Sequence, residues 1–197
     1  MSNAFYVNFD GTGYTAGSTI SSGADYAEYF EWEDGNFFDE DRRGYFVTIS
    51  GDKIRKATSY DYILGVVSGA PSVIGNGDID WAGRYVLDEF GSRIKETFEY
   101  EEEVVDKETG EITTVVTTGV RYKENPNYDA SRPYIQRADR PEWDAVGMLG
   151  VLAVRDDGTC VVNGYCTVTD EGTATAAGYG YRVIARVTDN VIKIILK

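Results

Sequence analysis

The feature that most constrains the fold of this chain is a series of short apolar runs, rich in Val, Ile and Tyr, separated by turns that contain glycine. β-Branched and aromatic residues pack well on a pleated surface, so runs of this kind are typical of β-strands. Such closely spaced strands predict a mainly β domain, a β-barrel or a sandwich, with little helix. The predicted strands cover residues 44–50, 53–57, 62–68, 146–155, 181–187 and 191–196, with a hairpin at 160–168 and a loop at 72–77.

The C-terminal run Val-Ile-Lys-Ile-Ile-Leu, residues 191–196, carries an expectation of its own. An exposed edge strand of this composition would invite pairing with other chains. We therefore expect this run to form a central strand, or one that a subunit interface covers.

A long β-hairpin is predicted between residues 94 and 123. One arm covers 94–105, the tip 106–111 and the return arm 112–122. Its acidic, Thr-rich faces indicate a solvent-exposed β-arm, or one that packs on another subunit.

The charge of the chain excludes several classes of function. The chain contains thirty-three acidic and nineteen basic residues, which gives a formal net charge of −14. Nucleic acids and anionic membranes need a basic surface, so neither is an expected partner. The group Gly11–Gly13 lacks the Lys-Ser/Thr of a phosphate-binding loop, and we expect no cofactor. No apolar stretch approaches transmembrane length, and no signal-peptide core follows Met1.

The two cysteines, Cys160 and Cys166, flank the turn-forming pair Asn163-Gly164. A two-residue turn there would direct the thiols to opposite faces, whereas a three-residue loop would place them across from each other. We expect reduced, structural thiols. Two cysteines in a chain without histidine make a poor zinc site, so we expect no metal.

The N-terminal part of the chain differs in composition from the rest. Residues 1–4 read as an expression leader, and residues 5–24 as an extended segment rich in Gly, Ser and Thr. We therefore expect residues 1–24 to be a leader plus the end of an upstream segment, and residues 25–197 to be the folded domain.

At this boundary the run Ala24–Trp32 interleaves aromatic residues with three carboxylates, Asp25, Glu28 and Glu31. We predict a short helix over residues 25–33. At 100° per residue the three acids would share an arc of about 120°, with the aromatic residues on the opposite side.

Three clustered carboxylates offer acid–base chemistry to a chain that has no histidine. Amide hydrolysis needs one group to activate water and another to protonate the leaving nitrogen. Two neighbouring carboxylates can divide these roles, because their pKa values split. A tethered substrate supplies geometry worth about 7–11 kcal/mol of the barrier. The alternative is a solvated, charged helix face.

Other candidate groups compete with this run. Asp78 with Asp80, Asp88 with Glu89, and Glu142 with Asp144 could supply a base or bind a cation, although such residues more often form turns or caps. Ser68 could be a nucleophile with Lys53 or Lys56 as its base. The sequence contains no Gly-x-Ser-x-Gly motif to support that reading.

Several strings of the chain together resemble one family, and they span about residues 20–197. The most specific is Ala-Asp-Tyr-Ala-Glu-Tyr-Phe-Glu-Trp at 24–32. The supporting strings lie at 40–41, 44–47, 62–68, 71–76, 140–143, 164–165 and 190–193. The family is the autoproteolytic intramolecular-chaperone domain, of the glutamic peptidase class, at the C-terminus of phage tail-spike and neck-appendage proteins.

The resemblance implies a concrete function. Such a domain forms a homotrimer, promotes assembly of the β-helical spike region upstream in the same chain, and then cleaves itself off. The cut would fall between Ala24 and Asp25, with residues 21–24 as substrate. Asp25 and Glu28 would be the main catalytic residues and Glu31 a weaker third. The resemblance places the protein in the bacterial host cytoplasm during phage assembly and the parent protein in the virion tail.

One residue departs from the pattern of the family. Arg43 stands where we expect an apolar residue. If it faces Asp41 or the catalytic acids, it will lower their pKa values and hinder a general-acid role.

The alternative function, from another class of protein, is a trimerisation or tip domain that is never cleaved and that binds host glycan through Tyr and Trp surfaces.

Overall fold

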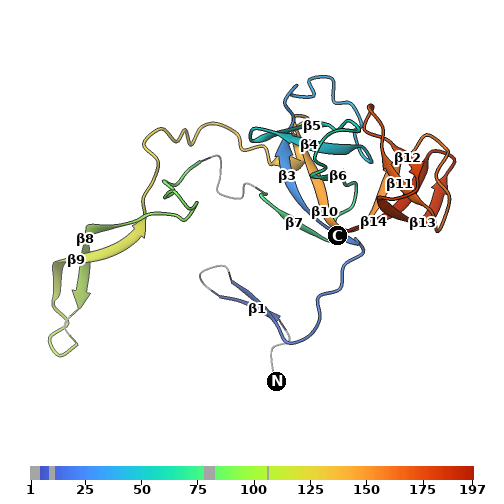
Figure 1. Ribbon diagram of the computed structural model, residues 1–197. Helices are drawn as coiled ribbons and strands as arrows, with labels where there is room; N and C mark the ends of the chain where they lie inside the picture. Colours follow the sequence, from blue (N-terminus) through green and yellow to red (C-terminus); the bar gives the residue numbers. More distant parts are fainter. Residues whose placement is uncertain (1–4, 9–11, 78–82, 106) are drawn as a thin grey trace. The chain divides into compact units, whose positions relative to one another are not determined.

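A computed structural model describes residues 5–8, 12–77, 83–105 and 107–197 of the chain (Figure 1). The chain divides into two units, and each is described by itself. The larger unit contains residues 1–77 and 137–197, and the smaller contains residues 78–136.

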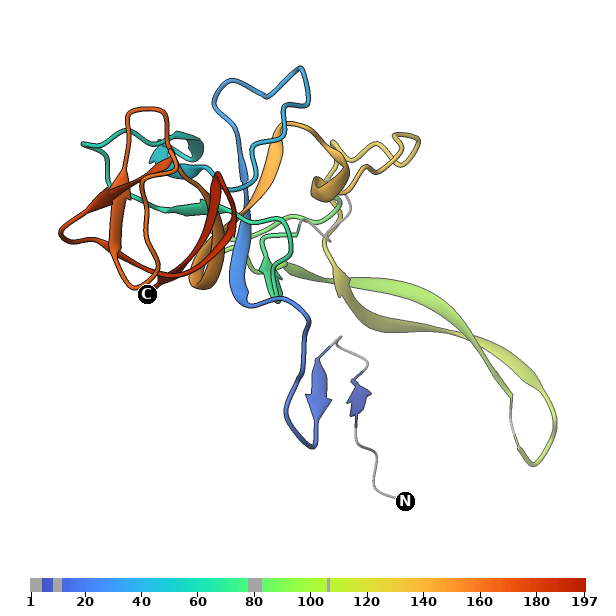
Figure 2. The same ribbon diagram turned by 90° about the vertical axis from the view of Figure 1, so that its right-hand side faces the viewer.

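The larger unit is built on one ten-stranded sheet, with the order β12-β11-β13-β14-β10-β6-β4-β5 and with β3 pairing with both β10 and β7. In Figure 2 the strands from β10 onward curl around the core, as in part of a barrel. The prediction of a mainly β, barrel-like fold is confirmed. The strands of this sheet are β3 (Asp25–Glu31), β4 (Phe46–Ser50), β5 (Lys53–Lys56), β6 (Gly65–Val67), β7 (Val73–Gly75), β10 (Trp143–Arg155), β11 (Tyr165–Val168), β12 (Ala174–Ala177), β13 (Tyr181–Thr188) and β14 (Val191–Leu196).

Other regular structure in this unit is brief. Strands β1 (Phe5–Val7) and β2 (Gly13–Thr15) pair with each other. The helical structure of the described residues is a single 3₁₀ turn, Arg137–Asp139. None of their helices is long and apolar enough to cross a membrane.

Strand β10 organises the sheet. Its residues 143–150 pair with β3, and its residues 150–155 pair with β14. The register with β3 shifts between Gly147 and Leu149, and Gly150 has a φ of +119°. A bulge followed by a glycine at positive φ bends a strand. This bend lies opposite the first residue of β3, because Gly150 pairs with Asp25.

Burial of apolar side chains on both sides of the sheet supplies the main stabilisation. One cluster includes Leu152, Val183, Ile192 and Ile194, all at most 2% exposed. Burying such a side chain is worth about 1.5–3 kcal/mol. Strand β14 pairs with β13 on one side and β10 on the other, so the prediction of a central terminal strand is confirmed.

The predicted helix over residues 25–33 is wrong. Residues 25–31 form strand β3, which pairs antiparallel with β10 and parallel with β7. Tyr and Phe favour strands when partner strands are present, and both partners come from distant parts of the sequence. The same pairing overturns the loop predicted at 72–77, because residues 73–75 form β7.

The predicted hairpin at 160–168 is also wrong. Residues 165–168 form β11, which pairs with β12 and β13, while Cys160 lies in a loop. The two thiols therefore interact instead of pointing to opposite faces, and both cysteines are free and buried. Burial, above all, raises the pKa of Cys160 to about 11 and that of Cys166 to about 12, so the thiols are unreactive structural groups.

The smaller unit contains the predicted hairpin, formed by β8 (Lys95–Val105) and β9 (Ile112–Tyr122). Phe98 packs across the ribbon on Gly119, where a Cβ would come within 2.8 Å of the ring. Nearly all side chains of the ribbon are exposed. In this single chain the ribbon is thus an exposed β-arm, the first of the two predicted alternatives. A two-stranded ribbon is marginal by itself in water, and the second alternative, packing on another subunit, stays a prediction.

Candidate functional site

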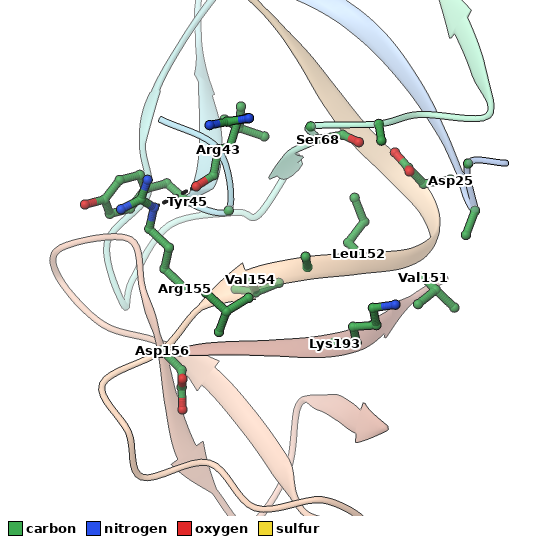
Figure 3. A pocket seen from close by; sticks show the side chains of 18 of the residues that line it. Asp25, Arg43, Tyr45, Ser68, Val151, Leu152, Val154, Arg155, Asp156 and Lys193 are labelled. Carbon is green, nitrogen blue, oxygen red and sulfur yellow. Dashed lines mark hydrogen bonds between the residues drawn. The ribbon is translucent and has the colours of Figure 1, made fainter. Parts of the chain in front are cut away.

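A cavity of about 750 Å³ lies at the bend of β10 (Figure 3). The start of β3, the loop after β6, the second half of β10 and β14 all contribute to its wall. Among the lining residues are Asp25, Ser68, Val151 and Lys193. The cavity thus forms where the expected cut site meets the sheet.

The backbone on both sides of the Ala24–Asp25 peptide bond is held in place. The amide of Val151 donates a hydrogen bond to the carbonyl oxygen of Ala24 at 3.2 Å. The amide of Ser72 donates to the carbonyl oxygen of Asp25 at 2.8 Å. The peptide bond is therefore fixed between the bend of β10 and the loop before β7.

The side chain of Asp25 is buried, and the residue is 6% exposed. Its Oδ2 is buried without a hydrogen-bond partner among the described residues. Burial raises the pKa of this carboxyl, and hydrogen bonding from the Ser68 hydroxyl and from Asp25's own backbone amide partly opposes the rise. Figure 3 shows the hydroxyl of Ser68 pointing toward Asp25. Burial thus favours the protonated form of the Asp25 carboxyl, which lies next to its own amide nitrogen.

The absence of a side chain at Gly147 makes room for the Asp25 carboxyl. A Cβ at this position would lie 2.6 Å from Oδ2 and would overlap the side chain of Leu152. The glycine therefore lets the carboxyl reach the interior of the curled sheet.

Glu28 projects from the other face of β3, because side chains alternate along a strand. Its Oε1 accepts a hydrogen bond from the Tyr26 hydroxyl at 2.5 Å, which raises the pKa of Tyr26. Three residues of strand span roughly 10 Å. Glu28 is therefore not directed at the Ala24–Asp25 bond of its own chain.

Glu31 is on the same face of β3 as Asp25 but roughly 20 Å along the strand. It accepts a hydrogen bond from Lys53 at 2.6 Å. The prediction that Asp25, Glu28 and Glu31 share one arc is wrong, and a single chain does not bring the three carboxylates together.

Ser68 lies beside Asp25 and not beside the lysines that sequence reasoning assigned to it. The Nζ atoms of Lys53 and Lys56 pair with Glu31 at 2.6 Å and Glu40 at 3.2 Å. The Ser68–Asp25 contact joins two segments far apart in the sequence. The only sequence feature that could have indicated this contact is a serine placed directly after a buried strand.

Arg43 faces Asp41, which is one of the two placements considered from the sequence. Its Nε lies 2.8 Å from Oδ1 of Asp41 and holds the pKa of that carboxyl at about 2. The effect falls on Asp41, whereas the pKa of Asp25 is raised. A lowered pKa is therefore a property of the neighbouring acid and not of Asp25.

Of the other acidic candidates, Asp88 and Asp144 have hydrogen-bond partners, and two lie outside the described residues. Asp88 accepts hydrogen bonds from the amides of Phe90 and Ser92, as in a turn. Asp144 accepts one from Nε1 of Trp32 at 2.8 Å. Asp78 and Asp80 lie outside the described residues.

One group of described residues has ligand atoms close enough together for a metal ion, namely Asp156, Asp157 and Cys160. Arg186 already binds both carboxylate oxygens of Asp156, at 3.2 and 2.9 Å. The guanidinium supplies the positive charge that a cation would otherwise bring, so the group is explained as a structural ion pair.

The fold and the site together define a class of protein, a β domain in which the strand that starts at Asp25 brings a backbone bond into a cavity of the same domain, beside a buried carboxyl. The chain belongs to the Peptidase_G2 family, the IMC (intramolecular chaperone) autoproteolytic cleavage domain, which it matches over residues 2–193. The resemblance inferred from the sequence is thereby confirmed.

The chain is similar to phage proteins in both sequence and structure. It is 37% identical, over 80% of its length, to the pre-neck appendage protein of Bacillus phage B103. It resembles the pre-mature bacteriophage phi29 gene product 12 with a TM-score of 0.71 and 30% identity over 95% of this chain and 24% of that one. The C-terminal fragment of the same gene product gives 0.65 and 31% identity, covering 88% of this chain and all of that one. The chain spans only 16% of the B103 protein.

Proposed function

We propose that this chain is the C-terminal intramolecular chaperone of a phage tail spike or appendage, which promotes trimer assembly and then cleaves itself between Ala24 and Asp25. Membership of the autoproteolytic family and the names of the relatives support this assignment. The observation that carries the cut position is the Ala24–Asp25 peptide, held by Val151 and Ser72 beside the buried Asp25 carboxyl. Assembly takes place in the host cytoplasm, and the parent protein ends in the virion tail.

In the proposed reaction Asp25 is the general acid. Burial favours its protonated form, and its carboxyl contacts the amide nitrogen that must leave. Water attacks the carbonyl carbon of Ala24 while a base takes a proton from the water. The C–N bond breaks as the Asp25 carboxyl gives its proton to the nitrogen. The first products are a carboxylic acid at Ala24 and an amine at Asp25. The new acid then gives its proton to the Asp25 carboxylate and the protonated base gives its proton to the amine, which leaves a carboxylate, an ammonium group and both catalytic groups in their starting states.

Glu28 is the proposed base, which makes the peptidase of the glutamic type. Its place on the opposite face of β3 from Asp25 keeps it from the cut site of its own chain. A second copy of the chain must then present Glu28 to the bond. Cleavage is thereby conditional on assembly, which suits a chaperone that is removed only after its work. Glu31, which is paired with Lys53, remains the weaker third candidate.

The proposal is tested by mass spectrometry of the chain, alone and fused to upstream spike sequence. Wild type is expected to yield a fragment that begins at Asp25, whereas Glu28→Gln is expected to remain at full length. The matched control is Glu33→Gln, at an exposed position of the same acidic region. If Glu28→Gln is cleaved at the wild-type rate, the role of Glu28 is wrong. If no chain is ever cleaved, the protein acts as a trimerisation or tip domain instead.

A further inference from the structure

The residues that precede the cut lie in a narrow slot with backbone on both sides. A Cβ placed on Gly23 would lie 2.5 Å from the carbonyl carbon of Pro71, 2.5 Å from the amide nitrogen of Ser72 and 2.6 Å from the carbonyl oxygen of Ala70. All three atoms belong to the main chain. The wall therefore cannot give way by a change of rotamer.

The opposite wall of the slot is formed by Gly150. A Cβ there would overlap the carbonyl oxygen of Ala24 and lie 2.9 Å from the Cα of Asp25. Gly150 also has a φ of +119°, a conformation that residues with side chains rarely adopt. Its neighbour Val151 donates the hydrogen bond to Ala24. Two glycines from distant parts of the chain thus allow the strand to approach this closely.

The side chain of Ala24, between Gly23 and Asp25, points away from the interior. Ala24 is exposed, whereas Asp25 is buried and Gly23 half-buried. This alternation is that of an extended strand, in which residues 23 and 25 face inward and residue 24 outward.

We propose that this slot determines the specificity of cleavage, requiring glycine at position 23 and aspartate at position 25 while tolerating varied side chains at position 24. The recognised substrate is an extended Gly-x-Asp segment of the same polypeptide. Gly23 is a specificity-determining residue, and Gly150 is a positioning residue for the carbonyl of Ala24. This inference rests on the proposed function for the identity of the bond that is cut.

The first experiment compares cleavage of three variants. Gly23→Ala is expected to slow the appearance of the fragment by about 100-fold or more, the loss that a misplacement of about 1 Å brings. Ala24→Leu should be slowed much less than Gly23→Ala, because residue 24 is exposed. Gly17→Ala is the matched control, because a Cβ at Gly17 would meet nothing within 4 Å. Cleavage of Gly23→Ala at the wild-type rate would contradict the proposal that the slot requires glycine at position 23.

The second experiment does not depend on cleavage. In the Glu28→Gln background, hydrogen exchange of the Val151 and Ser72 amides reports whether residues 24 and 25 occupy the slot. We expect Gly23→Ala, but not Gly17→Ala, to lose protection at these two amides while the thermal unfolding temperature and oligomer size stay unchanged. Unchanged protection of the two amides in Gly23→Ala would contradict the proposed role of the slot, whether or not wild type is cleaved. A wild type that is never cleaved would count only against the proposed function.

Discussion

The hydroxyl of Ser68 points toward the carboxyl of Asp25, in the cavity that also holds the Ala24–Asp25 peptide (Figure 3). A hydrogen bond from this hydroxyl favours the ionised carboxyl and so acts against the burial that raises its pKa. Ser68 therefore tunes the candidate acid in the proposed mechanism, whereas a serine peptidase would use it as the nucleophile.

The Ser68→Ala variant separates these two roles. Without the hydroxyl the pKa of Asp25 rises further, so the fall in cleavage rate at high pH should move to higher pH. The rate on the low-pH side of this fall should change by less than about 10-fold. Loss of a nucleophile would instead cost on the order of 10⁶-fold. The measurement is the pH profile of fragment formation, with Ser50→Ala as control, since its hydroxyl donates to Glu33 instead.

Replacing Asp25 with asparagine should stabilise the fold at neutral pH. The folded pKa of Asp25 is raised above its ordinary value of 3.8. Its contribution to stability is therefore full below that ordinary value and is lost as the pH rises through the folded pKa. Asparagine has no proton to lose, so Asp25→Asn should unfold at a higher temperature at pH 7. For a chain of this length each kcal/mol corresponds to about 2–4 °C.

The measurement is made in the Glu28→Gln background, which is also expected to stay uncleaved. Asp25→Asn/Glu28→Gln and Glu28→Gln then differ only at residue 25. The difference in unfolding temperature between the two variants should shrink toward zero below about pH 4, where Asp25 is protonated in both states. A difference that persists unchanged at low pH would show that ionisation of Asp25 is not its source.

Chains that lack one carboxylate each should complement each other. Asp25→Asn retains the proposed base and Glu28→Gln retains the proposed acid, and the two project from opposite faces of β3. If the proposed mechanism holds, Glu28 of one chain acts in mixed oligomers on the cut site of a Glu28→Gln neighbour. We expect fragments from the Glu28→Gln chain alone, detected by distinct mass tags after coexpression. Absence of any fragment, with mixed oligomers present, would contradict catalysis between chains.

Truncation of a side chain in β14 tests whether this strand is central and buried in the sheet. Ile194 is fully buried between β13 and β10, so Ile194→Ala should lower the free energy of unfolding by about 2–5 kcal/mol. Ile184 on the neighbouring β13 is 36% exposed, and Ile184→Ala should change the free energy of unfolding by about 0.5 kcal/mol or less. Denaturant titration measures both. Equal losses would mean that β14 is not a central strand.

Segments with a strong local pattern were predicted well from the sequence. The run 191–196 is apolar enough to require burial, and the run 181–187 is rich in Val, Ile and Tyr. The predicted arms of the hairpin at 94–122 flank a turn, so all these strands follow from nearby residues. The run at 25–31 was predicted to be helical because a helix would gather the three acids on one side, whereas a strand would divide them between two faces. Its pairing with β10, which begins at Trp143, decided between them.

The candidate site divides in the same way. The acids near the expected cut were recognisable because a chain without histidine must use carboxylates, hydroxyls or lysines for this chemistry. That Asp25 lies beside Ser68 and Val151, while Glu31 pairs with Lys53, depends on contacts between distant segments. Spacing along the chain carried no information about these partners.

The residue types and the β-strand pattern were enough to define a mostly β domain with carboxylates at its N-terminal boundary, since both are local properties. Which of those carboxylates is buried, and which backbone bond is held next to it, followed from the bend in β10 and the pairing of β3. Desolvation depends on every atom that surrounds a group, and those atoms are brought together only when the whole sheet has formed.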